Sequence, residues 1–236
     1  SGAMLDHVYR NEAQGWSPLG RLIDRIYLNA IGWRGIRVRR KLLEQTLRSI
    51  IEATHADGRP VRILDIASGP GRYVLEMMRA LPNIPMSAHL RDYMQVNLDA
   101  AARLRHALGL TRVTLSQGDA FDRASLASIT PKPTIAIVSG LYELFPENEP
   151  VRRSLAGLAD AVEPGGHLMY TNQPWHPQLE FIARVLTNRE GKPWVMRRRT
   201  QAEIDELVER SGFEKVSQEI DPWGIFTVSV ARRVAN

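Results

Sequence analysis

The chain has 236 residues, 44% of them hydrophobic, which is enough for the core of one domain but short for two. It contains no cysteine, so disulfides, thiol nucleophiles and thiolate zinc sites are excluded. The formal net charge is +5, yet no aromatic residues are interleaved with the basic ones as single-strand nucleic acid binding prefers. No apolar run approaches the roughly 18 residues of a membrane span and no signal pattern begins the chain, so we expect a cytoplasmic protein without a membrane span.

Residues 1–58 are predicted to be helical. Ser17 and Pro18 are typical of a helix start, and apolar residues then recur on one face, at Leu19, Leu22, Ile23 and Ile26. We expect Gly32 and Gly35 to interrupt this pattern before a longer helix that ends at Gly58. Residues 1–58 would form an N-terminal helical cap or extension and 59–236 the main domain. The helices either cover the carboxyl edge of the following sheet or pack as ordinary outer helices.

From residue 61 onward, strand and helix patterns alternate. Five short apolar runs predict strands at 61–66, 86–90, 113–116, 135–138 and 167–171. Crossovers between such strands give a parallel sheet with helices on both faces, so the fold class is α/β and doubly wound. The tail predicts two more strands at 214–220 and 225–231, joined by a tight turn as an antiparallel hairpin. The expected sheet therefore has seven strands, most of them parallel.

A glycine-containing loop follows the first predicted strand. Gly69 and Gly71 bracket a proline, but Val74 stands where a dinucleotide fingerprint needs a third glycine, and no Gly-Lys-Ser/Thr ending of a P-loop is present. Asp65, at the strand end, would repel a pyrophosphate and favour an ammonium or sulfonium. The loop therefore predicts a ligand with a cationic centre, a ribose and a base.

Further polar residues follow the next strands. Asp92 ends the second strand, where a carboxylate can accept both ribose hydroxyls. Asp119 follows the third, where it can accept from an adenine amino group while the backbone of Ala120 and Phe121 meets the ring edge. A lone aspartate after a strand is more often a helix cap or turn former, but three in succession beside this loop favour a ligand site.

These motifs together resemble those of class I S-adenosylmethionine-dependent methyltransferases. The matching stretches are Asp65–Gly71, Asp92, Asp119–Ala120, Pro164–Gly166 and the terminal hairpin. The resemblance implies a Rossmann-like fold with S-adenosylmethionine as cofactor. It departs from the family pattern at Ala67, where a glycine is usual, and at Thr134, where an acid is common. The implied cofactor-binding residues are Asp65, Ala67, Gly69, Gly71, Asp92, Asp119, Ala120, Phe121, Ser139 and Gly140.

Three further stretches are similar to a narrower group. Residues 139–145, 173–178 and 194–200 resemble a bacterial methyltransferase family, some of whose members are fused behind an α/β-hydrolase domain. Residues 27–37 resemble it too, which extends the resemblance to nearly the whole chain. The methyl acceptor is not implied by this resemblance.

Methyl transfer from a sulfonium is an in-line displacement that depends mainly on orientation and exclusion of water. A general base is needed only if the nucleophile loses a proton, and His176 is the first candidate, with a packed structural histidine as the alternative. Glu143 and Tyr142 are further catalytic candidates. Glu143 could equally pair with an arginine, and Tyr142 could equally form a wall of the cofactor pocket. Candidate substrate contacts are Tyr170 and Gln173, which we expect to face the same cleft, and Tyr9 and Tyr27, which could close it from the N-terminal cap. Such cap aromatics more often belong to the core than to a substrate wall. The six histidines show no paired metal-ligand spacing, so no metal is expected.

The preferred interpretation is a methyltransferase acting on a small-molecule or lipid-like acceptor. Arginine clusters at 34–40 and 197–199 motivate an RNA methyltransferase as the alternative, but we expect both clusters to be solvated faces rather than anion sites. A non-catalytic S-adenosylmethionine-binding domain is the third hypothesis, because methyl transfer requires no obligatory catalytic residue.

Overall fold

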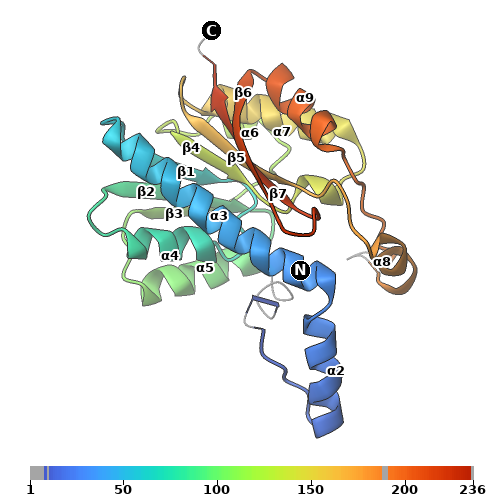
Figure 1. Ribbon diagram of the computed structural model, residues 1–236. Coiled ribbons are helices and arrows are strands. Elements are labelled where there is room, and N and C mark those ends of the chain that lie inside the picture. Colours follow the sequence, from blue (N-terminus) through green and yellow to red (C-terminus); the bar gives the residue numbers. More distant parts are fainter. Residues whose placement is uncertain (1–7, 10, 188–190, 235–236) are drawn as a thin grey trace.

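A computed structural model describes residues 8–9, 11–187 and 191–234. Its centre is a seven-stranded sheet in the order β3-β2-β1-β4-β5-β7-β6 (Figure 1). The strands are β1 (Val61–Asp65), β2 (Met86–Asp92), β3 (Val113–Gln117), β4 (Ile135–Val138), β5 (His167–Asn172), β6 (Phe213–Ile220) and β7 (Thr227–Arg233). The first five are parallel, and β7 runs antiparallel to both β5 and β6. The predicted α/β sheet with its C-terminal hairpin is confirmed.

Helices cover both faces of this sheet. The helices are α2 (Pro18–Leu28), α3 (Ile31–Ala56), α4 (Arg72–Ala80), α5 (Gln95–Ala107), α6 (Arg123–Ala127), α7 (Asn148–Ala161), α8 (Leu179–Val185), α9 (Gln201–Arg210) and the short 3-10 helix η1 (Tyr142–Leu144). One buried apolar cluster joins α3, α4 and α5 to the sheet, and a second joins α6, α7 and α9 to its other face. The molecule therefore has three layers with a core on each side of the sheet.

The direction of the chain reverses between β1 and β4. These strands are neighbours, but the chain moves from β1 outward to β2 and β3, and from β4 outward to β5. At such a switch point the connections leave in opposite directions, which opens a crevice at the carboxyl ends of the strands. Asp65 ends β1 and Ser139 directly follows β4, so the fold places both at this edge of the sheet.

The structure corrects the expectation that Gly32 and Gly35 break a helix. α3 is one continuous helix of 26 residues that runs through both positions. A Cβ at position 32 would lie 2.7 Å from His176 Nε2, and one at position 35 would lie 2.9 Å from the Phe226 ring. The glycines are needed for close packing rather than for a turn. α3 packs into the same buried cluster as α4, so no separate core marks residues 1–58 as a unit of their own. The boundary at residue 58 therefore stays a prediction. Residues 1–7 lie outside the described part of the chain.

The first helix departs from both expected roles. The apolar face of α2 points to solvent, with Leu19 65% and Ile26 66% exposed, while Leu28 on another face is buried. Figure 1 shows α2 projecting away from the sheet rather than covering its edge. α2 therefore neither covers the sheet edge nor packs as an outer helix, as was expected of the N-terminal helices, whereas α3 packs on the sheet together with α4 and α5.

We expect Gly35→Ala to lower the free energy of unfolding by about 1–3 kcal/mol, because the new methyl group would overlap the Phe226 ring. If Gly35 only weakened the helix, the same change would stabilise the protein by about 1 kcal/mol. Urea unfolding measures the sign. Ser49→Ala, on the exposed side of the same helix, is the control and should change stability by less than about 0.5 kcal/mol.

Candidate functional site

The loop after β1 is held in an unusual backbone conformation. Gly69 and Gly71 have φ angles of 55° and 64°, in the left-handed region that glycine adopts without strain. A Cβ at Gly71 would overlap the Leu90 side chain, whereas one at Gly69 would meet nothing within 4 Å. The loop therefore packs on β2 at one glycine and leaves open space at the other.

Asp92 ties this loop to the end of β2. Gly69 N donates to Asp92 Oδ2 at 2.8 Å, while Met94 N and the Asn97 side chain donate to Oδ1 at 2.8 and 2.9 Å. The residue is only 7% exposed. A carboxylate offers about four lone pairs, so three protein donors leave capacity for another hydrogen bond.

Asp65 is buried at the end of β1. Ala67 N donates to its Oδ1 at 3.2 Å, and the Tyr73 hydroxyl donates to its Oδ2. Burial raises the pKa of this carboxyl to about 7, although the hydrogen bonds from Tyr73 and Ala67 lower it. Tyr73 was missed as a site residue, and its position in the first turn of α4, two residues after Gly71, is the signal that could have identified it.

The end of β3 is more exposed. Asp119 Oδ1 accepts from Phe121 N at 2.9 Å, which is the hydrogen bond of a turn-forming aspartate. The Phe121 ring packs edge-on against Phe145, with 4.5 Å between centroids, and Ala120 is buried beside it. The structure thus places the three residues on one turn, with Asp119 at the surface.

Ser139 and Gly140 follow β4. Gly140 has φ of 69° and donates its N–H to Thr171 Oγ1 at 2.8 Å, which joins the ends of β4 and β5. Ser139 and Gly140 are both partly exposed. The β4 end therefore presents a short, open backbone segment beside the β1 loop.

A buried arginine holds the rest of the β4 loop. Arg199 is 1% exposed and donates to four carbonyl groups, those of Tyr142 at 2.6 Å, Phe145 at 2.7 Å, Glu147 at 3.0 Å and Pro146 at 3.4 Å. Its Nε donates to the Asn148 side chain at 2.8 Å. A planar guanidinium with five N–H groups suits this role, since it satisfies several carbonyl groups at once.

A second buried arginine approaches from α3. Arg39 is 5% exposed and contacts Glu143, with 3.3 Å between Nη1 and Oε1. The prediction that both arginine clusters are solvated faces was therefore wrong for Arg39 and Arg199. Each is buried because tertiary contacts supply acceptors that the local sequence does not show.

The two catalytic candidates after β4 differ in their surroundings. The Tyr142 hydroxyl donates to Ser154 Oγ at 2.8 Å inside the apolar cluster with α7, and burial raises its pKa well above the ordinary value. Glu143 is buried against Arg39, and burial raises its pKa. The carboxyl of Glu143 thus lies with α3, whereas the phenol of Tyr142 points into the core.

His176 lies against the start of α3. Its Nδ1 accepts from Gln178 N at 3.0 Å, which assigns the proton of the neutral ring to Nε2, and burial lowers its pKa. The neutral ring therefore offers a donor beside Gly32. Gln173, three residues before His176 on the segment that follows β5, is also buried. The role of His176 as a base stays a prediction.

The aromatic substrate candidates are not gathered in one place. The Tyr170 hydroxyl donates to Asp205 at 2.7 Å, and its ring lies in the cluster with α7 and α9 instead of facing the cleft as expected. Tyr27 packs on Trp33 at the α2–α3 junction and is 37% exposed. Tyr9 lies under Arg40, with 5.0 Å from the guanidinium carbon to the ring centroid. Of the three, Tyr9 is the one that contributes to raising the pKa of Tyr73, the residue that donates to Asp65.

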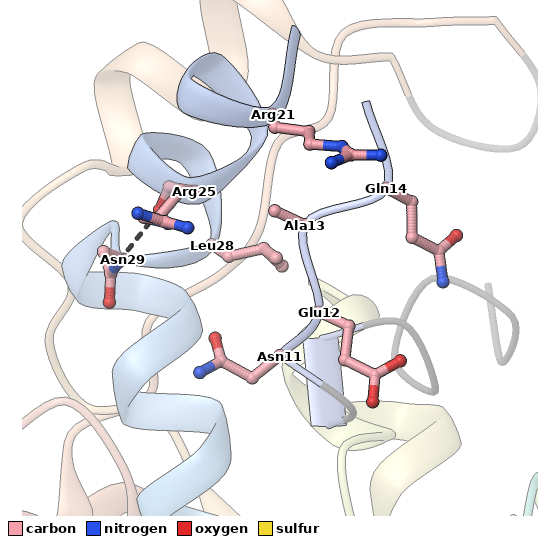
Figure 2. A pocket seen from close by; sticks show the side chains of 8 residues that line it. All are labelled: Asn11, Glu12, Ala13, Gln14, Arg21, Arg25, Leu28 and Asn29. Atoms are coloured by element: carbon pink, nitrogen blue, oxygen red, sulfur yellow. Dashed lines mark hydrogen bonds between the residues drawn. The ribbon is translucent and has the colours of Figure 1, made fainter. Parts of the chain in front are cut away.

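A pocket of about 560 Å³ lies elsewhere, between residues 11–14 and α2 (Figure 2). Its lining comes only from that segment, from α2 and from Asn29, so no strand-end residue takes part. Within the described ranges, no group of three histidine or acidic residues could hold a metal ion. No helix in that part of the chain is long and apolar enough to cross a membrane.

A protein-family model described as "Putative methyltransferase" matches residues 1–233. The chain belongs to this methyltransferase family. It is 55% identical over 240 residues to the uncharacterised protein YnbC of Escherichia coli K12, covering 100% of this chain and 40% of that protein. The chain thus spans less than half the length of this curated relative.

Several solved structures share the fold of this methyltransferase-family chain. A possible exported protein from Bordetella parapertussis has a TM-score of 0.78 at 19% identity, covering 100% of this chain and 80% of that one. The magnesium protoporphyrin IX methyltransferase of Synechocystis PCC 6803, with bound SAH, has a TM-score of 0.64 at 16% identity, covering 98% and 94%. At these identities the likeness shows the fold alone.

The raised pKa of Asp65 predicts a pH dependence of stability. The folded protein keeps this carboxyl protonated up to about pH 7, whereas the unfolded chain loses the proton around its ordinary pKa of 3.8. Between these values the unfolded chain binds fewer protons, so the contribution of Asp65 to the free energy of unfolding falls by about 1.4 kcal/mol per pH unit as pH rises. We expect Asp65→Asn to remove this slope in urea unfolding. Parallel curves for both proteins would contradict it.

Arg199→Lys should lower the free energy of unfolding by about 2–5 kcal/mol, because each buried carbonyl left without a donor costs about 1–3 kcal/mol. Lysine keeps the charge but cannot reach all four carbonyl groups at once. The exposed neighbour gives a matched control, and Arg198→Lys should change stability by less than about 0.5 kcal/mol. Equal effects of the two substitutions in chemical unfolding would show that Arg199 does not hold the loop.

Proposed function

We propose that this chain is an S-adenosylmethionine-dependent methyltransferase, of EC 2.1.1 type, that transfers a methyl group to a small-molecule or lipid-like acceptor by in-line displacement. The observation that carries the proposal is the hydrogen bond from Gly69 N to Asp92, which brings a left-handed glycine loop and a buried carboxylate together beside Asp65. Family membership supports the reaction class. The finer assignments below are drawn from this chain's own residues.

The strand ends fit the parts of this cofactor. Asp65 suits its cationic centre, since a carboxyl with a pKa of about 7 is readily ionised by a nearby positive charge. Asp92 has capacity left to accept ribose hydroxyls. Asp119, with the backbone of Ala120 and Phe121, suits the adenine, as the sequence predicts. When bound, the cofactor supplies an activated methyl group on sulfur.

The acceptor would meet the methyl group near the ends of β4 and β5. Gln173 and His176 are 5% and 7% exposed, so they fit a small molecule that enters the fold better than an extended polymer. The protein's contribution is orientation and exclusion of water, which the loop held by Arg199 supports. The hydroxyls of Tyr142 and Tyr170 already donate to Ser154 and Asp205, so neither is a proposed base.

RNA methylation is less well supported by the geometry. It rested on the two arginine clusters, and the burial of Arg39 and Arg199 removes one member of each from contact with a phosphate backbone. The cytoplasmic location stays a prediction.

We expect Asp92→Asn to weaken the binding of S-adenosylhomocysteine on the order of 10–100-fold, because hydrogen bonds to a charged acceptor contribute about 1.5–3 kcal/mol. Isothermal titration calorimetry measures the loss. Asp99→Asn, on the exposed side of α5, is the matched control and should bind as the wild type does. Unchanged affinity in Asp92→Asn would remove Asp92 from the cofactor site.

The acceptor can be identified by incubating the protein and a metabolite extract with cofactor that carries an isotopically labelled methyl group. A labelled small molecule or lipid whose formation requires the protein supports the proposal, and labelled RNA would favour the alternative. If the protein binds the cofactor but no labelled product forms in any extract fraction, the non-catalytic hypothesis is supported and methyl transfer is contradicted.

A further inference from the structure

The ion pair between Arg39 and Glu143 is incomplete on both sides. The two side chains touch through one contact of 3.3 Å, from Nη1 to Oε1, with side chains 6% and 5% exposed. Arg39 Nε and Glu143 Oε2 are both buried and have no hydrogen-bond partner in the described part of the chain. The contact thus leaves one buried donor and one buried acceptor without a partner.

Such an arrangement is unusual for buried charges. An arginine and a carboxylate in contact frequently form two parallel hydrogen bonds, and buried polar atoms are almost always paired. The Phe226 ring lies 4.8 Å from the Arg39 guanidinium carbon and occupies one face of the group. The contacts with Phe226 and Glu143 therefore fix the plane of the guanidinium, and with it the direction of the Nε–H group.

The pair lies at the switch point of the sheet. A Cβ at Gly140 would be 3.3 Å from Arg39 Nη2, so the guanidinium lies against the end of β4. Arg39 also acts electrostatically on Tyr73, whose hydroxyl donates to Asp65 at the end of β1. Arg39 thus lies between the ends of the two strands where the crevice opens.

Neighbouring arginines have their carboxylate or carbonyl partners within the protein. Arg40 binds Glu44 and Glu76, both at 2.7 Å, and Arg199 donates to loop carbonyls. Arg39 is the guanidinium at these strand ends with a buried donor left over among the described residues.

We propose that Arg39 and Glu143 bind the amino-acid end of the cofactor, Arg39 its carboxylate and Glu143 its ammonium group. This inference rests on the proposed function, because it concerns the same cofactor. A group carrying both charges completes both orphaned atoms at once, which a simple anion or cation does not. The helix α3, through Arg39, thereby becomes part of the cofactor site.

The test compares two ligands that differ only at this end. S-adenosylhomocysteine carries the amino-acid group, whereas 5′-methylthioadenosine has a methyl group in its place. We expect Arg39→Gln to weaken the first on the order of 10–100-fold, as for hydrogen bonds to charged groups, and to leave the second within about twofold. Arg39→Lys, which keeps the charge without the fork, should give an intermediate loss.

Glu143→Gln tests the other half of the pair. It should weaken S-adenosylhomocysteine more than the deaminated analogue, which keeps the carboxylate but lacks the ammonium group. Arg48→Gln, which breaks a more exposed pair with Glu52 on the same helix, is the control and should bind all three ligands normally.

The outcomes separate the two proposals. If the wild type binds neither ligand, the cofactor assignment fails and this inference fails with it. If the wild type binds both, and the Arg39 variants lose equal affinity for both or for neither, the cofactor assignment stands and the role of Arg39 is overturned. Retained binding of 5′-methylthioadenosine shows that a variant is folded. If Arg39→Gln does not fold, Arg39→Lys takes its place in the comparison of the two ligands.

Discussion

The carboxylate of Asp92 is the interaction on which the geometry of the site depends. It accepts hydrogen bonds from Gly69 N, Met94 N and the Asn97 side chain, so one charged group joins the glycine loop, the end of β2 and the start of α5. Hydrogen bonds to an ionised acceptor are strong, and they hold the loop in its left-handed turns. A loop ordered in this way requires little binding free energy to accommodate a ligand.

The second constraint is the β4 loop, which two arginines hold from different parts of the chain. Arg199 fixes its carbonyl groups, and Arg39 contacts Glu143 within it. Gly32 and Gly35 allow α3 to approach closely enough for Arg39 to reach that loop, since any side chain there would overlap His176 or Phe226. The position of Arg39 at the β4 loop therefore depends on the close packing of α3 at these two glycines.

The parts predicted correctly from the sequence are those with local signals. Strand periodicity, the glycine loop and the hairpin each depend on neighbouring residues, and the sheet matches them. The burial of Arg39 could not be read from its arginine-rich surroundings, because its partner Glu143 lies 104 residues away. Tyr170 was misplaced for a related reason: its position on β5 was clear, but the direction of its side chain depends on which face α9 covers. The exposed face of α2 has no local signal at all, since a solvent-exposed and a buried apolar stripe have the same sequence pattern.

The charges of the site also bear on how a methyltransferase would release its product. Burial raises the pKa values of Asp65 and Glu143, so both carboxyls gain from a positive ligand, and Arg39 supplies one positive charge beside Glu143. The cofactor carries a sulfonium and an ammonium against one carboxylate, whereas the product has lost the sulfonium charge. In the described part of the chain the hydrogen bonds to Asp65 come from two neutral donors, Ala67 N and the Tyr73 hydroxyl, so the loss of that charge would weaken the attraction of the ligand to its carboxylate. Under the proposed assignment, the buried Asp65 would therefore favour the charged cofactor over the product that has lost the sulfonium charge, which would assist product release.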